Sequence, residues 1–469
     1  MTVLLLRLSI EALENSSEPA SFQFRILRFA KIAPYSSQMA ELSPFHAWRY
    51  DPARSSLASL VTQPYDKITP EMQERYYRNS PHNLVRIVLG KSEPADNDRD
   101  NVYARASKHF REWRQNGVLI QDREPSIYGY AQRFEVPGSA GHTVERRGII
   151  ALGKLHDYSE QVVFRHEQTL SKPKADRLRL LQATGAHFEQ LFMLYDDPQQ
   201  QIERMLPWNQ PAIAEVVDDY GVANRVWRFS DATLIKQVRD AFAERKLIIA
   251  DGHHRYETAL AYRDEKRANG AAAGPKPWEQ VVMTYVNLHS PGLVILPTHR
   301  VIHGLAGFDP ERFAQRAAEH LQVETLAPGQ SAAAVAERLR SGPPNSILAI
   351  TGKRDYLLRA SPEKLGSFLA AFSGRQRSLD VIWLHKLLIE RVLGLSEQAV
   401  REQKHVTYVR DAGQAIGHVR TREAEVAFLM NPVTVEQMRD IALAGELMPQ
   451  KSTDFYPKLL SGLTIYAFD

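Results

Sequence analysis

The sequence predicts an α+β fold with a mixed β-sheet core and an additional small α/β domain. Apolar runs suited to buried strands, at 247–250 and 281–287, alternate with amphipathic segments of helical length. Two further strands, at 127–134 and 143–152, flank a Pro-Gly-Ser-Ala-Gly turn and are typical of a β-hairpin. Beyond residue 306 shorter helices and strands alternate, which indicates a separate layer.

The length of 469 residues indicates two or three domains with a large buried core. We expect residues 1–38 to be a disordered extension, or an over-called start ahead of Met39. A core over 39–305 should follow, then a small α/β and helical domain over 306–410. The last segment, 411–469, is expected to return to the core.

Composition excludes several classes of protein. The chain has no cysteine, so disulfides, thiolate catalysis and cysteine-ligated zinc are excluded. No apolar run approaches the roughly 18 to 20 residues of a membrane span. The net charge of +4 is small for this length, although the isoelectric point of about 9.0 leaves a nucleic-acid partner open. We expect a cytoplasmic protein with a small-molecule substrate. The sequence does not define its oligomeric state.

The N-terminal block contains the most ambiguous elements. Residues 70–79 form a polar helical stretch, and the apolar run at 84–89 is interpreted as a strand. The segment 102–116 is an amphipathic helix with Trp113 on one face. Its other face is basic and keeps a DNA-binding alternative open, through Arg105, Lys108, Arg111 and Arg114.

The remaining elements follow from periodicity. After the helical stretch that begins at Pro173 and the strand at 193–195, a helix is predicted over 256–266 and a strand over 293–296. The region beyond 306 is expected to contain helices 310–320 and 332–340, strands 346–351 and 356–359, a helical hairpin over 380–393 and 396–403, strand 425–430 and helix 435–444.

The most informative motif is the corner after the apolar run at 247–250. Asp251 and Gly252 end the run, and His253, His254 and Arg255 follow, ahead of a segment of helical character. Glycine lets a ligand approach the backbone, and the first N–H groups of a helix attract anions. Histidine and arginine add donors and positive charge suited to phosphate. A plain strand–turn–helix with exposed or hydrogen-bonded histidines is the alternative interpretation.

Three other segments carry candidate site residues. Glu167 precedes a basic stretch with Lys174 and Arg177, which is either a phosphate-binding cluster or a solvated helix start. Asp66 follows Pro-Tyr in what is most simply a turn. Lys451 begins a C-terminal segment, 451–458, that either reaches phosphate or caps the fold.

A zinc site is not predicted from the paired histidines. Adjacent residues such as His253 and His254 seldom both face one ion, and the chain has no His-Glu-x-x-His motif. The sequence therefore identifies no metal ligands.

Several motifs resemble the DUF1015 family of bacterial and archaeal proteins. They are Ala-Asp-Gly-His-His-Arg-Tyr-Glu-Thr-Ala at 250–259, Arg-His-Glu-Gln-Thr-Leu at 165–170, Pro-Lys-Ala-Asp-Arg at 173–177, Leu-Pro-Thr-His-Arg at 296–300 and Lys-Ser-Thr-Asp-Phe-Tyr-Pro-Lys at 451–458. The resemblance extends from about Met39 to Tyr466. The Gly-His-His-Arg-Tyr segment is also similar to the phosphate loop of the ParB/sulfiredoxin superfamily, which implies a ParB/sulfiredoxin-like core. Sulfiredoxin chemistry itself requires a cysteine and is excluded here.

The resemblance implies a small-molecule kinase that transfers phosphate from a nucleotide or pyrophosphate to free L-serine. Magnesium is expected to accompany the donor. The implied phosphate-binding residues are Gly252, His253, His254, Arg255, Lys174, Arg177 and Lys451. Glu167 is the first choice for the carboxylate that activates the acceptor, ahead of Asp66 and Asp251. The alternatives are a ParB-like nucleotide-binding regulator, a DNA-associated protein or a phosphate-dependent hydrolase.

Overall fold

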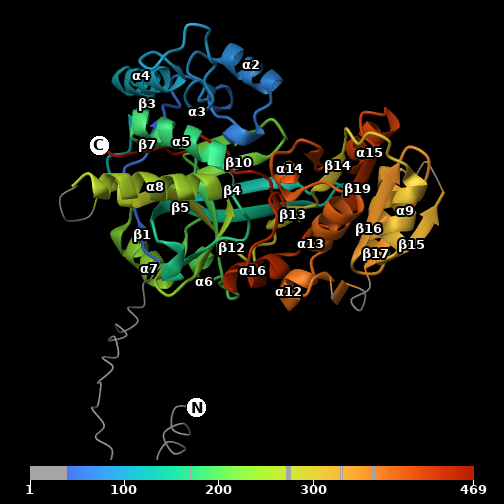
Figure 1. The fold of residues 1–469 in the computed structure, drawn as a ribbon. Coiled ribbons are helices and arrows are strands. Elements are labelled where there is room, and N and C mark those ends of the chain that lie inside the picture. Colours follow the sequence, from blue (N-terminus) through green and yellow to red (C-terminus); the bar gives the residue numbers. More distant parts are fainter. Residues whose placement is uncertain are drawn as a thin grey trace, which may run out of the picture. The chain divides into compact units, whose positions relative to one another are not determined.

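Two β-sheets organise the described part of the chain (Figure 1). The computed structural model describes residues 40–469, except 170, 271–275, 328, 330, 361–364 and 367, and leaves the side chains of 171–173 undescribed. The extension predicted over 1–38 lies outside the described residues. The architecture is a mixed α/β one, as the sequence predicts.

The larger sheet has nine strands and carries the glycine corner. Its order is β6 (Val163–Phe164), β11 (Leu247–Asp251), β8 (Leu191–Tyr195), β12 (Gln280–Asn287), β5 (Thr143–Lys154), β4 (Ile127–Glu135), β10 (Ala223–Phe229) and β9 (Ala214–Val217), with β1 (Leu42–Ser43) also on β5. The pairs β6–β11 and β8–β12 are parallel and the others antiparallel. The mixed sheet and the β4–β5 hairpin confirm the prediction.

Both faces of this sheet are covered, because successive side chains of a strand point to opposite faces. Leu247 and Ile249 of β11 join a core with α6 (Gln201–Met205), α7 (Ala232–Phe242) and α8 (His253–Ala268). Ile248 and Ala250 join a second core that includes Phe455 of the C-terminal segment. The carboxyl end of β11 is thereby fixed between the two cores.

The second sheet has six strands, all antiparallel to their neighbours. Its order is β15 (Leu321–Leu326), β17 (Asp355–Ala360), β16 (Ser346–Thr351), β19 (Val426–Met430), β14 (His299–Ile302) and β18 (Val406–Val409). One face packs on α10 (Ala332–Ser341) and α15 (Ala412–Arg420). The other packs on α9 (Pro310–Ala318), α13 (Asp380–Trp383) and the π-helix η5 (Leu384–Val392). The sheet takes β14 and β19 from outside 306–410.

One predicted strand is wrong. The apolar run at 84–89 forms the short helix α3 (Val85–Val88), which packs with α4 (Val102–Gln115) and α5 (Ser171–Thr184). The carboxamide oxygen of Asn83 accepts the N–H of Val85 at 3.0 Å and starts the helical turn. Val85 and Val88 are fully buried, and a run buried on all sides has no period that distinguishes helix from strand.

The C-terminal segment after α16 (Val435–Leu443) forms two small two-stranded sheets with earlier parts of the chain. Its strand β20 (Asp454–Tyr456) pairs with β13 (Val294–Leu296), and β21 (Tyr466–Ala467) pairs with β7 (Ala186–His187).

The remaining elements are β2 (Trp48–Tyr50), β3 (Leu119–Gln121), α2 (Pro70–Asn79), α12 (Gly374–Arg377), α14 (Glu397–Arg401), and the short helices η1 (Leu57–Ser59), η2 (Tyr65–Lys67), η3 (Tyr158–Glu160) and η4 (Pro277–Glu279).

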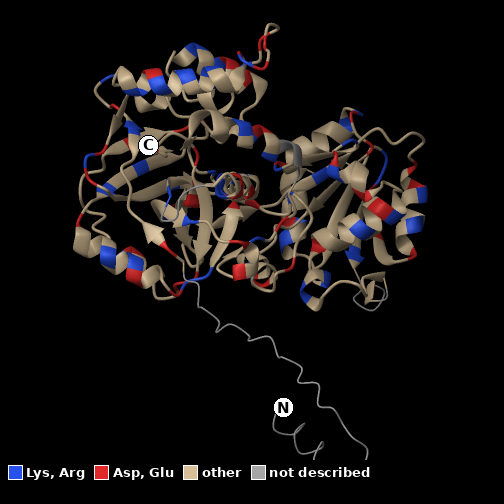
Figure 2. Ribbon diagram, turned by 60° about the vertical axis from the view of Figure 1, so that its left-hand side comes forward, with Lys and Arg blue, Asp and Glu red and all other residues tan. Residues whose placement is uncertain are grey.

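Charged residues of both signs are interspersed along the outer helices (Figure 2). Within the described residues, no helix has the length and apolarity that a membrane crossing requires.

Candidate functional site

The site is built around the corner between β11 and α8. Gly252 has φ +95°, in the left-handed region that favours glycine. A Cβ there would lie 2.9 Å from Leu191 Cδ2 and 3.1 Å from the Arg255 guanidinium. The helix begins at His253, three residues before the predicted start, and its N-cap residue, Gly252, has no side chain to cap the first turn. The corner therefore directs an uncapped helix N-terminus, with its partial positive charge, toward an adjoining cavity.

Two joined cavities open on this corner. The smaller, of about 80 Å³, is lined by Asp66, Glu167, Lys451 and residues 251–255. The larger has a volume of about 600 Å³ and shares Asp66, Glu167, Asp251, His253 and Lys451 with the smaller one. The structure thus brings together eight of the ten predicted site residues, from four separate stretches of the chain.

Asp251 is held as a half-buried anion. Its carboxylate contacts Lys458 Nζ at 2.9 Å and Arg255 Nη2 at 3.1 Å. Burial alone would raise the pKa of Asp251, but the positive charges of Lys458 and Arg255 more than offset this and lower it. Arg255 also donates to the carbonyl of Gln190 at 2.7 Å. The ion pair between Asp251 and Arg255 therefore stabilises the turn between β11 and α8.

Glu167 fixes a turn of the C-terminal segment. Its carboxylate accepts the N–H of Lys451 at 3.1 Å, and the N–H and hydroxyl of Thr453 at 2.7 Å each. Lys451 has φ +57° and an exposed side chain. No hydrogen-bond or ion-pair partner is found for its ammonium among the described residues. Glu167 thus positions Lys451 at the junction of the two cavities.

Asp66 is the carboxylate with the fewest constraints. Asp66 lies in η2, the short helix that follows Pro64. Its side chain is exposed and lines both cavities. The described residues offer its carboxylate no hydrogen-bond or ion-pair partner. Lys67 Nζ, in the same turn, lies 3.9 Å from Asp454 Oδ1, at the limit of an ion pair. Burial, and then the charge of Lys458, lower the pKa of Lys67.

The C-terminal segment and the second sheet complete the larger cavity with Asp454, Lys458 and Arg410, which are not among the ten predicted site residues. Arg410 Nε lies 2.5 Å from Asp454 Oδ2, and Lys458 Nζ lies 3.2 Å from Asp454 Oδ1. Asp411 starts α15, where its side chain accepts the N–H of Gln414. The segment 451–458 indicated Lys458 in the sequence, but nothing local indicated Arg410.

The two histidines at the corner differ in environment. His253 is buried edge-to-face against His166, with ring centroids 4.8 Å apart. Burial and the neighbouring His166 hold the pKa of His253 well below its usual value. Burial and Lys451 also lower the pKa of His254. Both rings are therefore neutral near pH 7. Within the described residues, no group of three or more His, Asp or Glu side chains is arranged to hold a metal ion.

Lys174 and Arg177 are the two predicted residues that do not line these cavities. Lys174 Nζ bonds Glu257 at 2.8 Å, one turn along α8. Arg177 donates to the carbonyl of Val88 at 2.8 Å, and its guanidinium lies 4.1 Å from the centre of the Tyr65 ring. Arg177 therefore stabilises the turn that carries Asp66. Lys174 links α5 to α8 through Glu257.

Comparisons with known proteins identify a family and distant structural neighbours. The family model described as "Protein of unknown function (DUF1015)" matches residues 42–382. No curated protein matches the chain. A conserved hypothetical protein from Pyrococcus furiosus is 13% identical, with 66% of this chain and 92% of that chain covered and a TM-score of 0.33.

Two further solved structures show the same degree of similarity. A free serine kinase in complex with AMP is 13% identical, covering 65% of this chain and 86% of that chain, with a TM-score of 0.34. SbnI with a C-terminal truncation, from Staphylococcus aureus, is 12% identical, covering 68% and 87%, with a TM-score of 0.35.

Proposed function

The chain belongs to the DUF1015 family, and we propose that its two joined cavities form a phosphoryl-transfer site. In this proposal a nucleotide or pyrophosphate places its phosphates at the N-terminus of α8, and the hydroxyl of a small molecule accepts the phosphoryl group. One observation carries the proposal. An uncapped helix N-terminus at Gly252, the ammonium of Lys451 and the carboxylate of Asp66 face the same cavity.

Electrostatics support a phosphate donor at this position. Phosphoryl transfer depends mainly on positioning and on neutralising charge. The amides at the start of α8 supply fixed donors, and Lys451 supplies a cation that is not already neutralised by a carboxylate among the described residues. His254 is neutral near pH 7, so it would act as a hydrogen-bonding group and not as a third cation.

The contacts of the three carboxylates favour Asp66 as the general base. Glu167 is occupied by three hydrogen bonds, and Asp251 is held between Lys458 and Arg255. Asp66 would take the proton of the acceptor hydroxyl while the hydroxyl oxygen forms a bond to the terminal phosphorus of the donor. The bond from that phosphorus to the bridging oxygen breaks, and its electron pair leaves with the remaining phosphate group.

The larger cavity suits a small acceptor that carries both charges. Its wall presents Arg410 and Asp411, side by side in the chain and of opposite sign. A free amino acid could place its carboxylate and its ammonium against such a wall. L-Serine, which the sequence resemblance implies, is therefore the first acceptor to test.

Magnesium would enter with the donor. Mg²⁺ commonly binds through one or two carboxylates, substrate phosphates and water. In this proposal the ion would be held mainly by the phosphates of the donor and by water. When bound, the ion would neutralise phosphate charge.

A ParB/sulfiredoxin-like core is a further part of the proposal. The strand, left-handed glycine and helix from β11 to α8 support it, because this unit combines a close backbone approach with a helix N-terminus. A strand-by-strand comparison of the nine-stranded sheet with such cores tests this part of the proposal.

The test is product formation by matched variants. Purified protein is incubated with L-serine, Mg²⁺ and ATP, ADP or pyrophosphate, and phosphoserine is followed by phosphorus NMR. We expect Asp66→Asn to lower turnover by about 10²- to 10⁴-fold, as for loss of a general base, while donor affinity is retained. Asp98→Asn, an exposed aspartate of the 93–100 loop, is the matched control and should retain turnover.

The outcome also separates the alternatives. Nucleotide binding without any phosphorylated product would favour a nucleotide-binding regulator. Phosphate release without transfer to serine would favour a hydrolase. Equal turnover of Asp66→Asn and Asp98→Asn would remove Asp66 from the chemistry.

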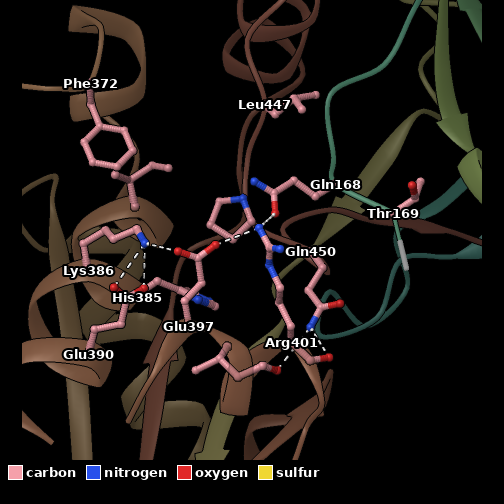
Figure 3. A pocket seen from close by; sticks show the side chains of 13 residues that line it. Gln168, Thr169, Phe372, His385, Lys386, Glu390, Glu397, Arg401, Leu447 and Gln450 are labelled. Carbon is pink, nitrogen blue, oxygen red and sulfur yellow. Dashed lines mark hydrogen bonds and ion pairs between the residues drawn. The ribbon is translucent and has the colours of Figure 1, made fainter. Parts of the chain in front are cut away.

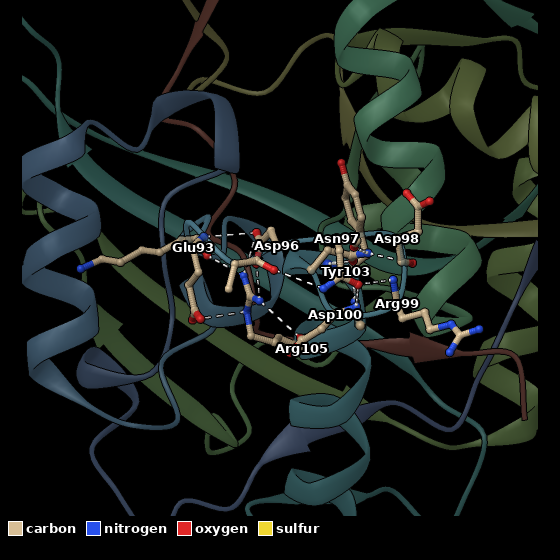
Figure 4. A network of polar contacts seen from close by, with 12 residues as sticks. Glu93, Asp96, Asn97, Asp98, Arg99, Asp100, Tyr103 and Arg105 are labelled. Atoms are coloured by element: carbon tan, nitrogen blue, oxygen red, sulfur yellow. Dashed lines mark hydrogen bonds and ion pairs between the residues drawn. The ribbon is translucent and has the colours of Figure 1, made fainter.

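The DNA-associated alternative depends on the basic face of α4, and carboxylates of the same chain contact several side chains of this face. Arg105 is held by the acidic loop at 93–100, with Asp96 Oδ1 at 2.6 Å and Asp100 Oδ1 at 3.5 Å (Figure 4). Arg114 pairs with Asp469 at 2.6 Å. Lys108 lies 4.0 Å from Glu112. Three of the four basic side chains of this face, those of Arg105, Lys108 and Arg114, thus lie within 4.0 Å of a carboxylate of the same chain.

A further inference from the structure

A separate cavity of about 270 Å³ adjoins the phosphate cavity and plays no part in the proposed chemistry (Figure 3). The two cavities share Gln168 and Gln450 as lining residues. Figure 3 shows Phe372 and Lys386 on one side of this cavity and Gln168 and Thr169 on the opposite side. The two cavities therefore lie next to each other, with Gln168 and Gln450 between them.

The walls of this cavity combine apolar side chains with polar and charged ones. Phe372, Ile382, Val400, Leu447 and Pro449 contribute to its lining. Its volume is near the lower end of small-molecule sites, which hold about 300–1,000 Å³. The cavity is thus suited to one part of a ligand, and burial of an uncharged group against these walls would be favourable.

The charged side chains of the cavity neutralise one another. Lys386 Nζ lies 2.8 Å from Glu390 Oε1 and 3.0 Å from Glu397 Oε2. Arg401 lies 2.7 Å from Glu397 and donates to the Gln168 side-chain oxygen at 3.0 Å. Two cations and two anions leave no net charge to attract a phosphate. The amide nitrogen of Gln168 has no hydrogen-bond acceptor among the described residues and can donate to an uncharged ligand.

We propose that this cavity is the subsite for the nucleoside end of a nucleotide whose phosphates lie at the N-terminus of α8. The inference rests on the proposed function, since it requires the phosphate end to be bound at Gly252. It also assigns the donor, because pyrophosphate would leave the cavity empty. The acceptor would then bind in the larger cavity, which is lined in part by Tyr220.

Two variants test the subsite without touching the phosphate cavity. Phe372→Ala removes a flat wall, and Leu447→Trp fills the space. Phe368→Ala is the matched control, since Phe368 packs against His320 and Arg391 and does not line the cavity. Tyr220→Ala tests whether the nucleobase binds in the large cavity instead. Tyr220 is an aromatic side chain of that cavity and is 52% exposed. Binding of ADP and of pyrophosphate to the full chain is measured by calorimetry.

We expect Phe372→Ala and Leu447→Trp to weaken ADP binding by about tenfold, with pyrophosphate binding changed by less than about twofold. Phe368→Ala should leave both affinities unchanged. The subsite is overturned if ADP binding is insensitive to both cavity variants, or if only Tyr220→Ala weakens it. It is also overturned if both ligands weaken equally, because the cavity would then act only through the fold. If wild-type protein binds neither ligand, the proposed function itself fails.

Discussion

Glu167 and Asp66 lie on the same cavity but differ in what their carboxylates do. Glu167 accepts three hydrogen bonds from Lys451 and Thr453, whereas Asp66 has no such partner among the described residues. A carboxylate that is fully occupied by protein donors is a poor base for a substrate hydroxyl, since its oxygens are already satisfied. The two residues should therefore separate in experiment, with Glu167 governing stability and Asp66 governing turnover.

The substitution Glu167→Gln tests this separation. A carboxamide has one accepting oxygen, and its NH₂ group would face an N–H donor of the 451–453 turn. We expect a loss of about 1–3 kcal/mol in the free energy of unfolding, measured by urea denaturation. Donor affinity should fall because Lys451 is released. Glu244→Gln, at an exposed glutamate of the turn after α7, should leave the free energy unchanged. A fully stable Glu167→Gln protein without turnover would instead restore Glu167 as the base.

At the scale of the element, the corner between β11 and α8 combines two requirements. The backbone of Gly252 adopts φ +95°, and the space beside it is filled by Leu191 and Arg255. Any side chain would strain the backbone and contact these neighbours. The same corner aims the start of α8 at the cavity, so strain there should affect the ligand as well as the fold.

Gly252→Ala is expected to cost stability and phosphate affinity together. The left-handed conformation alone costs a non-glycine residue about 1–2 kcal/mol. Gly138→Ala is a matched control, because Gly138 has φ +78° with nothing within 4 Å of the added Cβ. The control should show the backbone cost alone, measured by urea unfolding, and unchanged pyrophosphate binding. Equal effects of the two substitutions on both measurements would argue against a role of the corner in anion binding.

The elements show where sequence patterns succeed and fail. The β4–β5 hairpin, β11 and the helices beyond 306 were predicted because their period or turn residues are local signals. The run at 84–89 was predicted as a strand, but Asn83 starts a helical turn there and burial on all sides removes the period. The helix after Gly252 begins at His253 because glycine in the left-handed region allows the turn to form at once.

At the scale of the whole molecule, the candidate site depends on contacts between distant parts of the chain. The motif at 250–259 and the residues Asp66, Glu167 and Lys451 are assigned to one site by the family resemblance, but no local pattern in the sequence shows that they converge. Arg410 carried no local signal, because its place at the cavity follows from the packing of the second sheet against the C-terminal segment. Lys174 fitted the pattern of a phosphate ligand but bonds Glu257, a carboxylate 83 residues away.

Burial of neutral histidines couples the stability of the whole chain to pH. His166, His253, His299 and His385 are buried, and burial is the first cause that lowers the pKa of each. Below pH 6.5 the unfolded chain binds protons that the folded chain excludes. The free energy of unfolding therefore falls as pH falls from 6.5 toward the folded pKa.

His299 allows this coupling to be measured at one residue. Burial and Arg300 lower its pKa to about 4, and its Nδ1 accepts the N–H of Met430 at 3.4 Å. Its contribution to stability is fully present above pH 6.5 and is lost between pH 6.5 and 4. Wild-type protein should thus lose about 2 kcal/mol more than His299→Gln between pH 7 and pH 5 in urea unfolding. His142→Gln, at an exposed turn, should follow the wild type. Parallel pH profiles of wild type and His299→Gln would show that the folded chain accommodates the charged ring.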